Sequence, residues 1–515
     1  MEHTAFTSDL FAENTRLNTR VTELENVVTE LSALVKHFEE LFRLSQIKRF
    51  GSSSEKTSVN GQVSMFEITA PEITTTLPAE HEEIKYTRRK RVGKREADLS
   101  KLPLEIIEHE LPETERKCPE CNGNVTEIGV QTRDELKIIP AQVIRLQHRA
   151  KTYKCPECAE SAEKTPIIKA TMPAPLIKGS IASASAVSHI MTQKHLMHLP
   201  FYRLEQDFQR QGVAISRQTM SNWTIQVCED RLLPVYSTMK AALLKRDVLH
   251  ADETSVQVLN EPGKAAETKS YMWLYRTSGD ASNPIVLYDY QPGRGGQYPD
   301  NFLRNWRGYL HADGYSSYRM LKNVTLIGCW AHLRRKFDEA AKISKNDNSA
   351  AKIGLDYCNR LFALERDFAA LSSEKRHESR QTQSLPLAET FFAWVKTQSF
   401  PPKLAITRAL NYAQSHEDCF MNVFLDGRFE LSNNRAERSI KPFVLGRKNW
   451  LFCNSVRGAK ASAVAFSIIE TAKENGLKPF EYLDFLLESL PNANMRDLDA
   501  LLPWGIAVPD ECRMK

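Results

Sequence analysis

The tripeptide His-Ala-Asp occurs twice in this chain, and each copy closes a short apolar segment. The first copy places Asp252 directly after residues 248–251, and the second places Asp313 directly after residues 309–312. Short apolar runs that are bounded by polar or glycine-rich breaks are typical of buried strands. Because strand ends lie at the rim of a sheet, the repeat predicts that two aspartates from neighbouring strands meet there.

The segments around the two tripeptides have the pattern of a mixed α/β domain. We expect three strands, a helix, a strand, a helix or turn, and a final strand. The strands and the first helix are expected at 248–251, 271–276, 285–290, 299–306 (the helix), 309–312 and 324–329.

Two carboxylates at one rim point to a particular chemistry. They repel each other unless a cation lies between them, and Mg²⁺ or Mn²⁺ prefers carboxylate, water and phosphate oxygens. A pair of such ions can activate a water or a 3′-hydroxyl and stabilise the leaving oxygen of a phosphodiester displacement. A single aspartate is more often a turn or helix cap, so the matched tripeptide is what favours a shared site at Asp252 and Asp313.

Glu437 is the best candidate for a third carboxylate. Residues 432–434 supply N-capping chemistry for a helix that begins just before it. The glutamate has basic neighbours, which suits a carboxylate beside a phosphate backbone. A surface glutamate in an ion-paired helix is the alternative. The basic residues that we expect to contact DNA here are Arg435, Arg438, Lys441, Arg447 and Lys448.

The stretch between Asp313 and Glu437 is longer than a compact nuclease core needs. Residues 336–420 have helical spacing and predict an all-helical insertion. A C-x-x-H motif, Cys329 and His332, comes just before it, and for this pair a structural role is favoured over metal binding because no second pair follows. Trp330 is expected either to stack on a DNA base or to pack in a core.

Two Cys-Pro-Glu-Cys motifs predict a zinc ribbon at 109–172. Each C-x-x-C pair can present two thiolates to one tetrahedral zinc, and two pairs complete a structural four-cysteine site. Short strands are expected between them at 135–139 and 142–146, and a redox pair is the alternative. The zinc ligands are Cys118, Cys121, Cys155 and Cys158.

A helix-turn-helix is expected at 173–238. Pro200 begins a helix, Gly212 marks a stop and Ser216 is a suitable N-cap for the next helix. That helix would bury Met220, Trp223 and Val227, whereas an ordinary three-helix packing unit is the alternative. The side chains expected to face DNA are Arg217, Gln218, Ser221 and Asn222.

The N-terminal region carries a heptad repeat in residues 8–46. Leucine and valine recur at two positions of the heptad, and Asn14 interrupts one of them. This pattern predicts a coiled coil in 1–50 that pairs identical chains, whereas a single amphipathic helix packed on its own protein is the alternative. Residues 51–108 lack periodicity and predict a linker, with a basic run at 88–95.

Composition adds only weak constraints. A length of 515 residues predicts about three or four domains, and the net charge of +5 is mildly basic. No apolar stretch approaches the roughly 20 residues that cross a bilayer, and early acidic residues argue against a signal peptide. We therefore expect a cytoplasmic protein without a membrane partner, in which the ten cysteines are reduced.

These motifs together resemble transposases of the insertion-sequence family IS sixty-six over nearly the whole chain. The resemblance rests on the cysteine pairs and on segments 50–56, 200–205, 216–223, 250–254, 313–315, 329–332, 433–438 and 501–504. It implies an RNase H-like fold, an Asp-Asp-Glu triad at Asp252, Asp313 and Glu437, and strand cleavage and transfer with two metal ions. It also implies that Cys329 and His332 support the active site and that small accessory proteins are partners. A prokaryotic, nucleoid-associated location is a further implication of the resemblance.

We therefore expect a multidomain α+β protein, with core segments at 239–335 and 421–476 and a C-terminal segment at 477–515. The expected activity is metal-dependent cleavage at insertion-element ends and 3′-hydroxyl strand transfer into target DNA. Two Mg²⁺ (or Mn²⁺) and one structural Zn²⁺ are the expected cofactors. A non-catalytic DNA-binding regulator with a decayed nuclease domain, and an RNase H-like nuclease without strand transfer, are the alternatives.

Overall fold

The computed structural model describes residues 2–50, 106, 141–154, 167–344, 346, 348–493 and 497–514. The chain divides into two compact units, one of Ser54–Ala141 and one of Met1–Ser53 with Gln142–Lys515. The helices and strands described below all belong to the second unit. The four cysteines of the expected zinc ribbon and the basic run at 88–95 lie outside the described residues.

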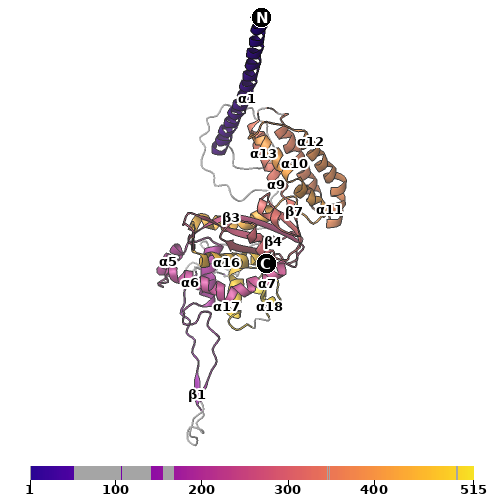
Figure 1. Ribbon diagram of the computed structural model, residues 1–515. Helices are drawn as coiled ribbons and strands as arrows, with labels where there is room; N and C mark the ends of the chain where they lie inside the picture. The colour runs from indigo at the N-terminus through magenta and orange to yellow at the C-terminus, as the bar shows by residue number, and fades with distance from the viewer. Residues whose placement is uncertain are drawn as a thin grey trace, which may run out of the picture. The chain divides into compact units, whose positions relative to one another are not determined.

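A mixed sheet forms the centre of the second unit (Figure 1). Its strand order is β5-β4-β3-β6-β7, and β8 pairs with the far end of β3. Strands β3, β4 and β5 are antiparallel neighbours, whereas β6 and β7 run parallel to β3. The strands are β3 (Val248–Asn260), β4 (Lys269–Thr277), β5 (Val286–Gln291), β6 (Gly308–Ala312), β7 (Val324–Gly328) and β8 (Cys453–Ser455).

The expected order of elements in this region is confirmed. Helix α8 (Gln297–Phe302) lies between β5 and β6, and the 3-10 helix η3 (Ser316–Met320) lies between β6 and β7. One boundary was wrong: β3 does not end at Asp252 but continues to Asn260. The backbone beyond Asp252 remains paired, because β4 is its antiparallel partner as far as Gln257 and β8 joins at Val258 and Asn260.

Side chains of β3 alternate between two differently covered faces, as they must in a strand. Leu249 and Ala251 belong to the apolar cluster that includes helices α4 to α7 and the C-terminal helices. Val256 and Val258 belong to a second cluster with Phe443 of helix α15 (Asn434–Trp450). The even-numbered residues of β3, which include Asp252, therefore face the side on which α15 packs.

Helix α16 (Val456–Glu474) covers the edge strand β5. Ser467 and Thr471 bond the backbone of Tyr288 and Val286, so the helix satisfies polar groups at the sheet edge that have no strand partner. After α16 come α17 (Pro479–Ser489), α18 (Leu498–Leu501) and the 3-10 helix η6 (Asp510–Cys512).

The helices before the sheet have the expected helix-turn-helix order. Ser216 is the N-cap of α6, where its hydroxyl accepts from the Thr219 amide, and Met220, Trp223 and Val227 are buried. This region comprises α4 (Ala184–His195), α5 (Phe201–Arg210), α6 (Arg217–Val227), the π-helical turn η2 (Cys228–Leu232) and α7 (Leu233–Leu243).

Helices alone occupy the described chain between β7 and α15, with an aromatic core around Trp330 and Phe391 (Figure 1). They begin directly after β7, slightly earlier than the expected insertion. They are α9 (Trp330–Ile343), α10 (Ala350–Asp367), α11 (Ser373–Ser379), the π-helical turn η4 (Arg380–Ser384), α12 (Leu385–Thr397), α13 (Ala405–Ser415), α14 (Glu417–Met421) and the 3-10 helix η5 (Asn422–Leu425).

The N-terminal region is one helix, α1 (Glu2–Phe50), whose described heptad side chains are exposed. Near the expected ribbon, residues 142–146 do not form the strand we expected. Instead β1 (Thr152–Lys154) pairs with β2 (Ile167–Lys169) in an antiparallel ladder. Among the described residues, no helix is both long and apolar enough to cross a membrane.

Candidate active site

The two His-Ala-Asp tripeptides lie side by side because β3 and β6 are parallel neighbours. His250 pairs in register with His311, which is the last described pair of this ladder. Asp252 follows two residues later within β3, and Asp313 follows directly after β6 ends at Ala312. Residues two apart in a strand share a face. Each aspartate therefore lies two residues past its histidine along neighbouring strands, next to the paired His250 and His311.

The histidines of the repeat form a buried stack beneath the aspartates. Their rings lie 4.2 Å apart at an interplanar angle of 6°, and both side chains are fully buried. Burial lowers the pKa of His250 to about 4 and that of His311 well below its usual value. Both rings are therefore neutral at physiological pH, and they act as a packed support rather than as charged groups.

Asp252 is a half-buried acid with other acids close by. Its pKa is raised well above the ordinary value, first by burial and then by repulsion from Glu253, Asp313 and Glu437. The Glu253 amide donates to Asp252 Oδ1 at 2.8 Å, which favours the ionised form but does not cancel the other effects. The three expected carboxylates thus lie within electrostatic reach of one another, and a cation among them would offset this repulsion.

Asp313 is held by the turn that follows β6. Its Oδ1 accepts a hydrogen bond from the Tyr315 amide at 3.0 Å, a local bond that aspartate commonly makes in turns. The turn orders the carboxylate and leaves its second oxygen available to a ligand.

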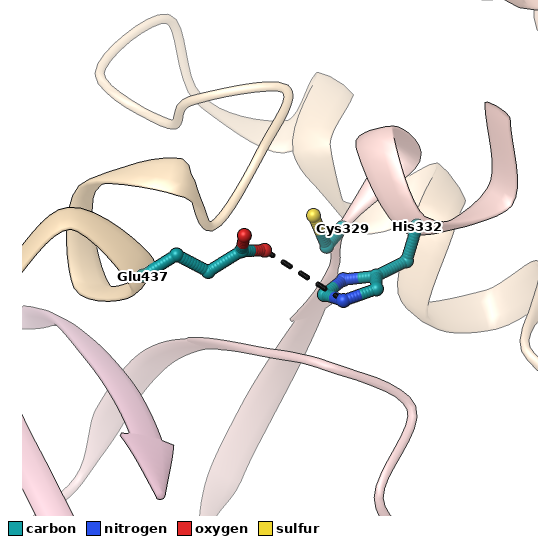
Figure 2. Close-up of side chains that lie close together, drawn as sticks. All are labelled: Cys329, His332 and Glu437. Carbon is teal, nitrogen blue, oxygen red and sulfur yellow. Dashed lines mark ion pairs between the residues drawn. The ribbon is translucent and has the colours of Figure 1, made fainter. Parts of the chain in front are cut away.

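Glu437 projects from the first turn of α15 toward the start of α9 (Figure 2). Its Oε1 lies 3.6 Å from His332 Nε2, and its Oε2 lies 3.9 Å from Arg335 Nη2. Glu437 Oε1 is buried and has no hydrogen-bond partner among the described residues. An acceptor that is buried and unsatisfied is costly, so this atom fits a role as a ligand for a cation.

Cys329, His332 and Glu437 offer ligand atoms that lie within 4.8 Å of one another (Figure 2). The residue types suit zinc, but the sulfur already has a partner, because the Asn433 amide donates to Cys329 Sγ at 3.2 Å. Burial raises the pKa of the Cys329 thiol to about 11, so without a bound metal it is protonated at neutral pH. The structural role that we expected for this motif stays a prediction, and the hydrogen bond from Asn433 is compatible with it.

Sequence reasoning missed Glu253 and its partners on the opposite face of β3. Arg294 donates to Glu253 from Nε at 2.8 Å, and Tyr318 donates to the other carboxylate oxygen. The Arg294 guanidinium also lies 3.6 Å from the centre of the Tyr315 ring. Burial, followed by repulsion from Asp313, raises the pKa of Glu253. The adjacent acid in His-Ala-Asp-Glu and the arginine in the glycine-rich break were the available signals.

N-capping chemistry for α15 was expected from residues 432–434, and the N-cap does lie there, at Asn433. Asn433 is the N-cap residue, but its side chain makes no capping bond and reaches across to β3 instead. The residue is 1% exposed. A buried amide must find partners for its donor and its acceptor, and β3 supplies both.

The buried position of Trp330 contradicts its expected stacking on a DNA base. Its ring is completely buried among Phe391, Phe392 and Phe420, and its Nε1 donates to the Phe420 carbonyl at 3.1 Å. The core-packing alternative is therefore the correct one for this residue.

The basic residues expected along α15 differ in their surroundings. Arg438, Lys441 and Lys448 are exposed. Arg447 donates to the Thr254 hydroxyl at 3.1 Å, and Arg435 forms an ion pair with Glu430. The three exposed residues lie three and seven positions apart, so they share one face of the helix.

Helix α6 presents the polar face expected of a recognition helix. Arg217, Gln218 and Asn222 are exposed and Ser221 is half-buried. Gln218 Nε2 donates to Asn222 Oδ1 at 2.9 Å, and the Arg217 guanidinium lies 6.0 Å from the Tyr202 ring centre. These contacts are weak enough to be exchanged for contacts with DNA.

Comparison with known protein families agrees with this arrangement. The model of the transposase IS66 family matches residues 179–461, which include all three carboxylates. The chain belongs to the IS66 transposase family. Three further models match: the IS66 C-terminal element at 467–504, the zinc-finger binding domain of transposase IS66 at 115–159, and the "Transposase C of IS166 homeodomain" at 37–107. A zinc-binding, DNA-binding insertion-sequence transposase is therefore established at family level, as the sequence predicted.

Relatives of similar length occur in Sinorhizobium fredii. The uncharacterized protein y4jD is 29% identical over 414 residues, which are 76% of this chain and 78% of the relative. The uncharacterized protein y4qI is 29% identical over 420 residues, which are 78% of this chain and 75% of the relative. The similarity extends well beyond the cysteine motifs.

Proposed function

We propose that this chain is a DNA transposase that cuts DNA at the ends of an insertion element and joins the freed 3′-hydroxyl to target DNA. The observation that carries the proposal is the parallel pairing of β3 with β6, which brings Asp252 and Asp313 to one edge of the sheet, where helix α15 adds Glu437. Such an arrangement is unfavourable without a counter-charge and fits two bound metal ions beside a phosphodiester. Membership in a transposase family supports the same reading.

The sheet order supports an RNase H-like core. Three antiparallel strands come first, and two further strands lie parallel to the first of them. This order brings Asp252 beside Asp313 and lets α15 carry Glu437 across the same face. The proposed boundaries of the core, 239–335 and 421–476, stay predictions.

Asp252, Asp313 and Glu437 would hold two Mg²⁺ (or Mn²⁺), and bound ions of this kind supply activation of a water or 3′-hydroxyl and stabilisation of the leaving oxygen. Asp252 is half-buried and its surroundings disfavour its charge, so a bound cation would interact with it more strongly than in bulk water. The exposed face of α15, with Arg438, Lys441 and Lys448, is suited to the phosphates of the bound DNA end.

End recognition would fall to the zinc finger and to α6. Four cysteines at 118, 121, 155 and 158 would hold one structural Zn²⁺, in agreement with the zinc-finger match over 115–159. Arg217, Gln218, Ser221 and Asn222 lie where a recognition helix contacts bases. Small accessory proteins of the same element stay a predicted partner.

Strand transfer on a defined DNA end tests the proposal. Labelled duplexes carrying the terminal inverted repeats that flank the gene are incubated with Mg²⁺ and plasmid target. The wild-type chain is expected to cut the end and link it to the plasmid. Glu437→Gln is expected to lose both reactions by at least about 1000-fold, as loss of a transition-state group does. Asp300→Asn, an exposed acid on α8, is the matched control and keeps both reactions.

The two alternatives give different results in the same assay. Cutting without joining indicates a nuclease, and end binding without any metal-dependent cutting indicates a decayed regulator. Either result contradicts the proposed transposase activity.

Self-association through α1 is part of the proposal. The heptad side chains that the structure describes, from Leu17 to Phe42, are exposed along one continuous helix. A row of exposed apolar residues at heptad spacing is stabilised by a second such helix. Deletion of residues 1–48 is expected to lower the number of chains per particle, which light scattering measures as the molar mass divided by the mass of one chain. An unchanged number of chains contradicts the coiled coil.

A further inference from the structure

Asn433 makes four hydrogen bonds that join three separate segments of the fold. Its side-chain Nδ2 donates to the Ala251 carbonyl at 2.8 Å, and its Oδ1 lies 2.9 Å from His250 Nδ1. Its backbone amide donates to Cys329 Sγ at 3.2 Å, and its carbonyl accepts from the Glu437 amide at 3.1 Å. One buried residue thus contacts β3, the start of α9 and the first turn of α15.

These contacts are adjacent to every carboxylate of the candidate site. Ala251 directly precedes Asp252, and the His250 ring stacks on His311, which lies two residues before Asp313. The bond from the Glu437 amide to the Asn433 carbonyl closes the first turn of α15, so Glu437 is fixed about one helical turn from Asn433. A shift of Asn433 would therefore move Glu437 relative to both aspartates.

We propose that Asn433 is the positioning residue that holds α15 on β3 and so keeps Glu437 within reach of Asp252 and Asp313. This inference rests on the proposed metal-dependent function and names a residue that acts through the carboxylates. It also explains the C-x-x-H motif in part, because Cys329 receives the backbone amide of this same asparagine.

The position needs a side chain that donates and accepts at once. The Ala251 carbonyl can only accept, so the amide nitrogen must face it, and the amide oxygen then faces His250. His250 must therefore carry its proton on Nδ1 to complete the pair. Alanine would leave the Ala251 carbonyl and the His250 ring unsatisfied, and aspartate would set two oxygen acceptors against each other.

Mn²⁺ binding to the full chain tests the proposal without depending on turnover. Free Mn²⁺ is measured by electron paramagnetic resonance for the wild type, Asn433→Ala and a matched control, Asn475→Ala. Asn475 also joins the end of a helix to a neighbouring segment, since its Nδ2 donates to the Thr471 carbonyl in α16 at 2.8 Å and to the Pro284 carbonyl just before β5 at 2.7 Å. We expect about 10- to 100-fold weaker Mn²⁺ binding in Asn433→Ala, as for other residues that orient ligands, and a change under about twofold in Asn475→Ala.

Binding of labelled element ends is measured in parallel and is expected to stay within about twofold for both variants. If Asn433→Ala does not fold, Asn433→Asp keeps the shape of the side chain and is measured in its place. Its single-turnover cleavage rate at saturating Mn²⁺ is expected to fall at least about tenfold, because Glu437 is displaced and no longer completes the site.

Wild-type Mn²⁺ affinity in Asn433→Ala overturns the positioning role, and so does an equal loss of affinity in Asn433→Ala and Asn475→Ala. Unchanged cleavage by Asn433→Asp overturns it as well. A wild-type chain that binds Mn²⁺ but never cuts DNA contradicts the proposed function, whereas the ratio of Mn²⁺ affinities between wild type and Asn433→Ala still decides the role of Asn433.

Discussion

The carboxylate site and helix α6 differ in how their polar side chains are surrounded. At the carboxylate site, Asp252 is half-buried beside other acids and its pKa is raised. On α6, Arg217 and Gln218 are solvated and make only weak contacts. The first region bears an electrostatic cost before any ligand arrives, and the second bears none. This difference is what we expect between the proposed cation site and the proposed DNA-binding surface.

Among the substitutions that test the difference between buried and exposed groups, we expect the largest effect on stability from Trp330→Ala. Trp330→Ala should lower the free energy of unfolding by about 3–5 kcal/mol, because a large buried ring leaves a cavity. Trp330→Phe should be milder and should keep DNA affinity. Chemical denaturation and binding of element ends measure the two quantities. If Trp330→Phe folds stably but binds DNA more weakly, the residue contributes to DNA binding and the core-packing role is wrong.

Substitutions of exposed side chains on α6 test the proposed DNA-binding surface. Arg217→Ala and Gln218→Ala should each weaken end binding by about 1–3 kcal/mol if they contact bases. Cleavage of DNA at saturating concentration should persist, since the carboxylates are untouched. Arg304→Ala, at an exposed arginine outside α6, is the control. Equal losses of affinity at Arg304 and Arg217 would show a general charge effect and not recognition by the helix.

The unfavourable electrostatics at Asp252 should lower the stability of the folded chain at neutral pH. An acid whose pKa is raised on folding binds its proton more tightly in the folded state, so stability falls as pH rises from its unfolded pKa of about 3.9 through the raised value. Asp252→Asn should therefore raise the melting temperature at neutral pH by about 2–4 °C in the absence of Mg²⁺ and Mn²⁺. Scanning calorimetry between pH 5 and 8 measures this.

Adding Mg²⁺ should stabilise the wild type more than Asp252→Asn, because ligand binding to the folded state alone raises its stability. A wild type that melts above Asp252→Asn in metal-free buffer at neutral pH would contradict the electrostatic cost at this site.

The smallest expected effect concerns the exposed face of α15. Lys441→Ala and Lys448→Ala should each make the salt dependence of DNA binding shallower by about one unit of slope, since each lysine would neutralise one phosphate. Binding isotherms at several salt concentrations give the slope. A slope that neither substitution changes would place the DNA away from this face of α15.

Local patterns were enough to predict much of the fold. The order of strands around Asp252 and Asp313 was predicted correctly, because short apolar runs and polar breaks are local signals. Ser216 as the N-cap of α6 and the burial of Met220, Trp223 and Val227 were also predicted, since capping and helical spacing depend on nearby residues. The extension of β3 beyond Asp252 was missed, because polar residues follow Asp252 and the strand continues there through its pairing with β4 and, at its far end, with β8.

The sequence by itself was enough to single out the residues of the proposed sites: the repeated His-Ala-Asp, the cysteine pairs and the glutamate at the start of α15. Only the tertiary structure decided what surrounds them. In the folded chain Trp330 is buried among phenylalanines. The side chain of Asn433 bonds to β3 and does not cap α15. Glu253 accepts a hydrogen bond from Arg294. These outcomes depend on which distant segments pack together. Burial and hydrogen-bond partners are properties of that packing, whereas motif spacing is a property of the chain alone.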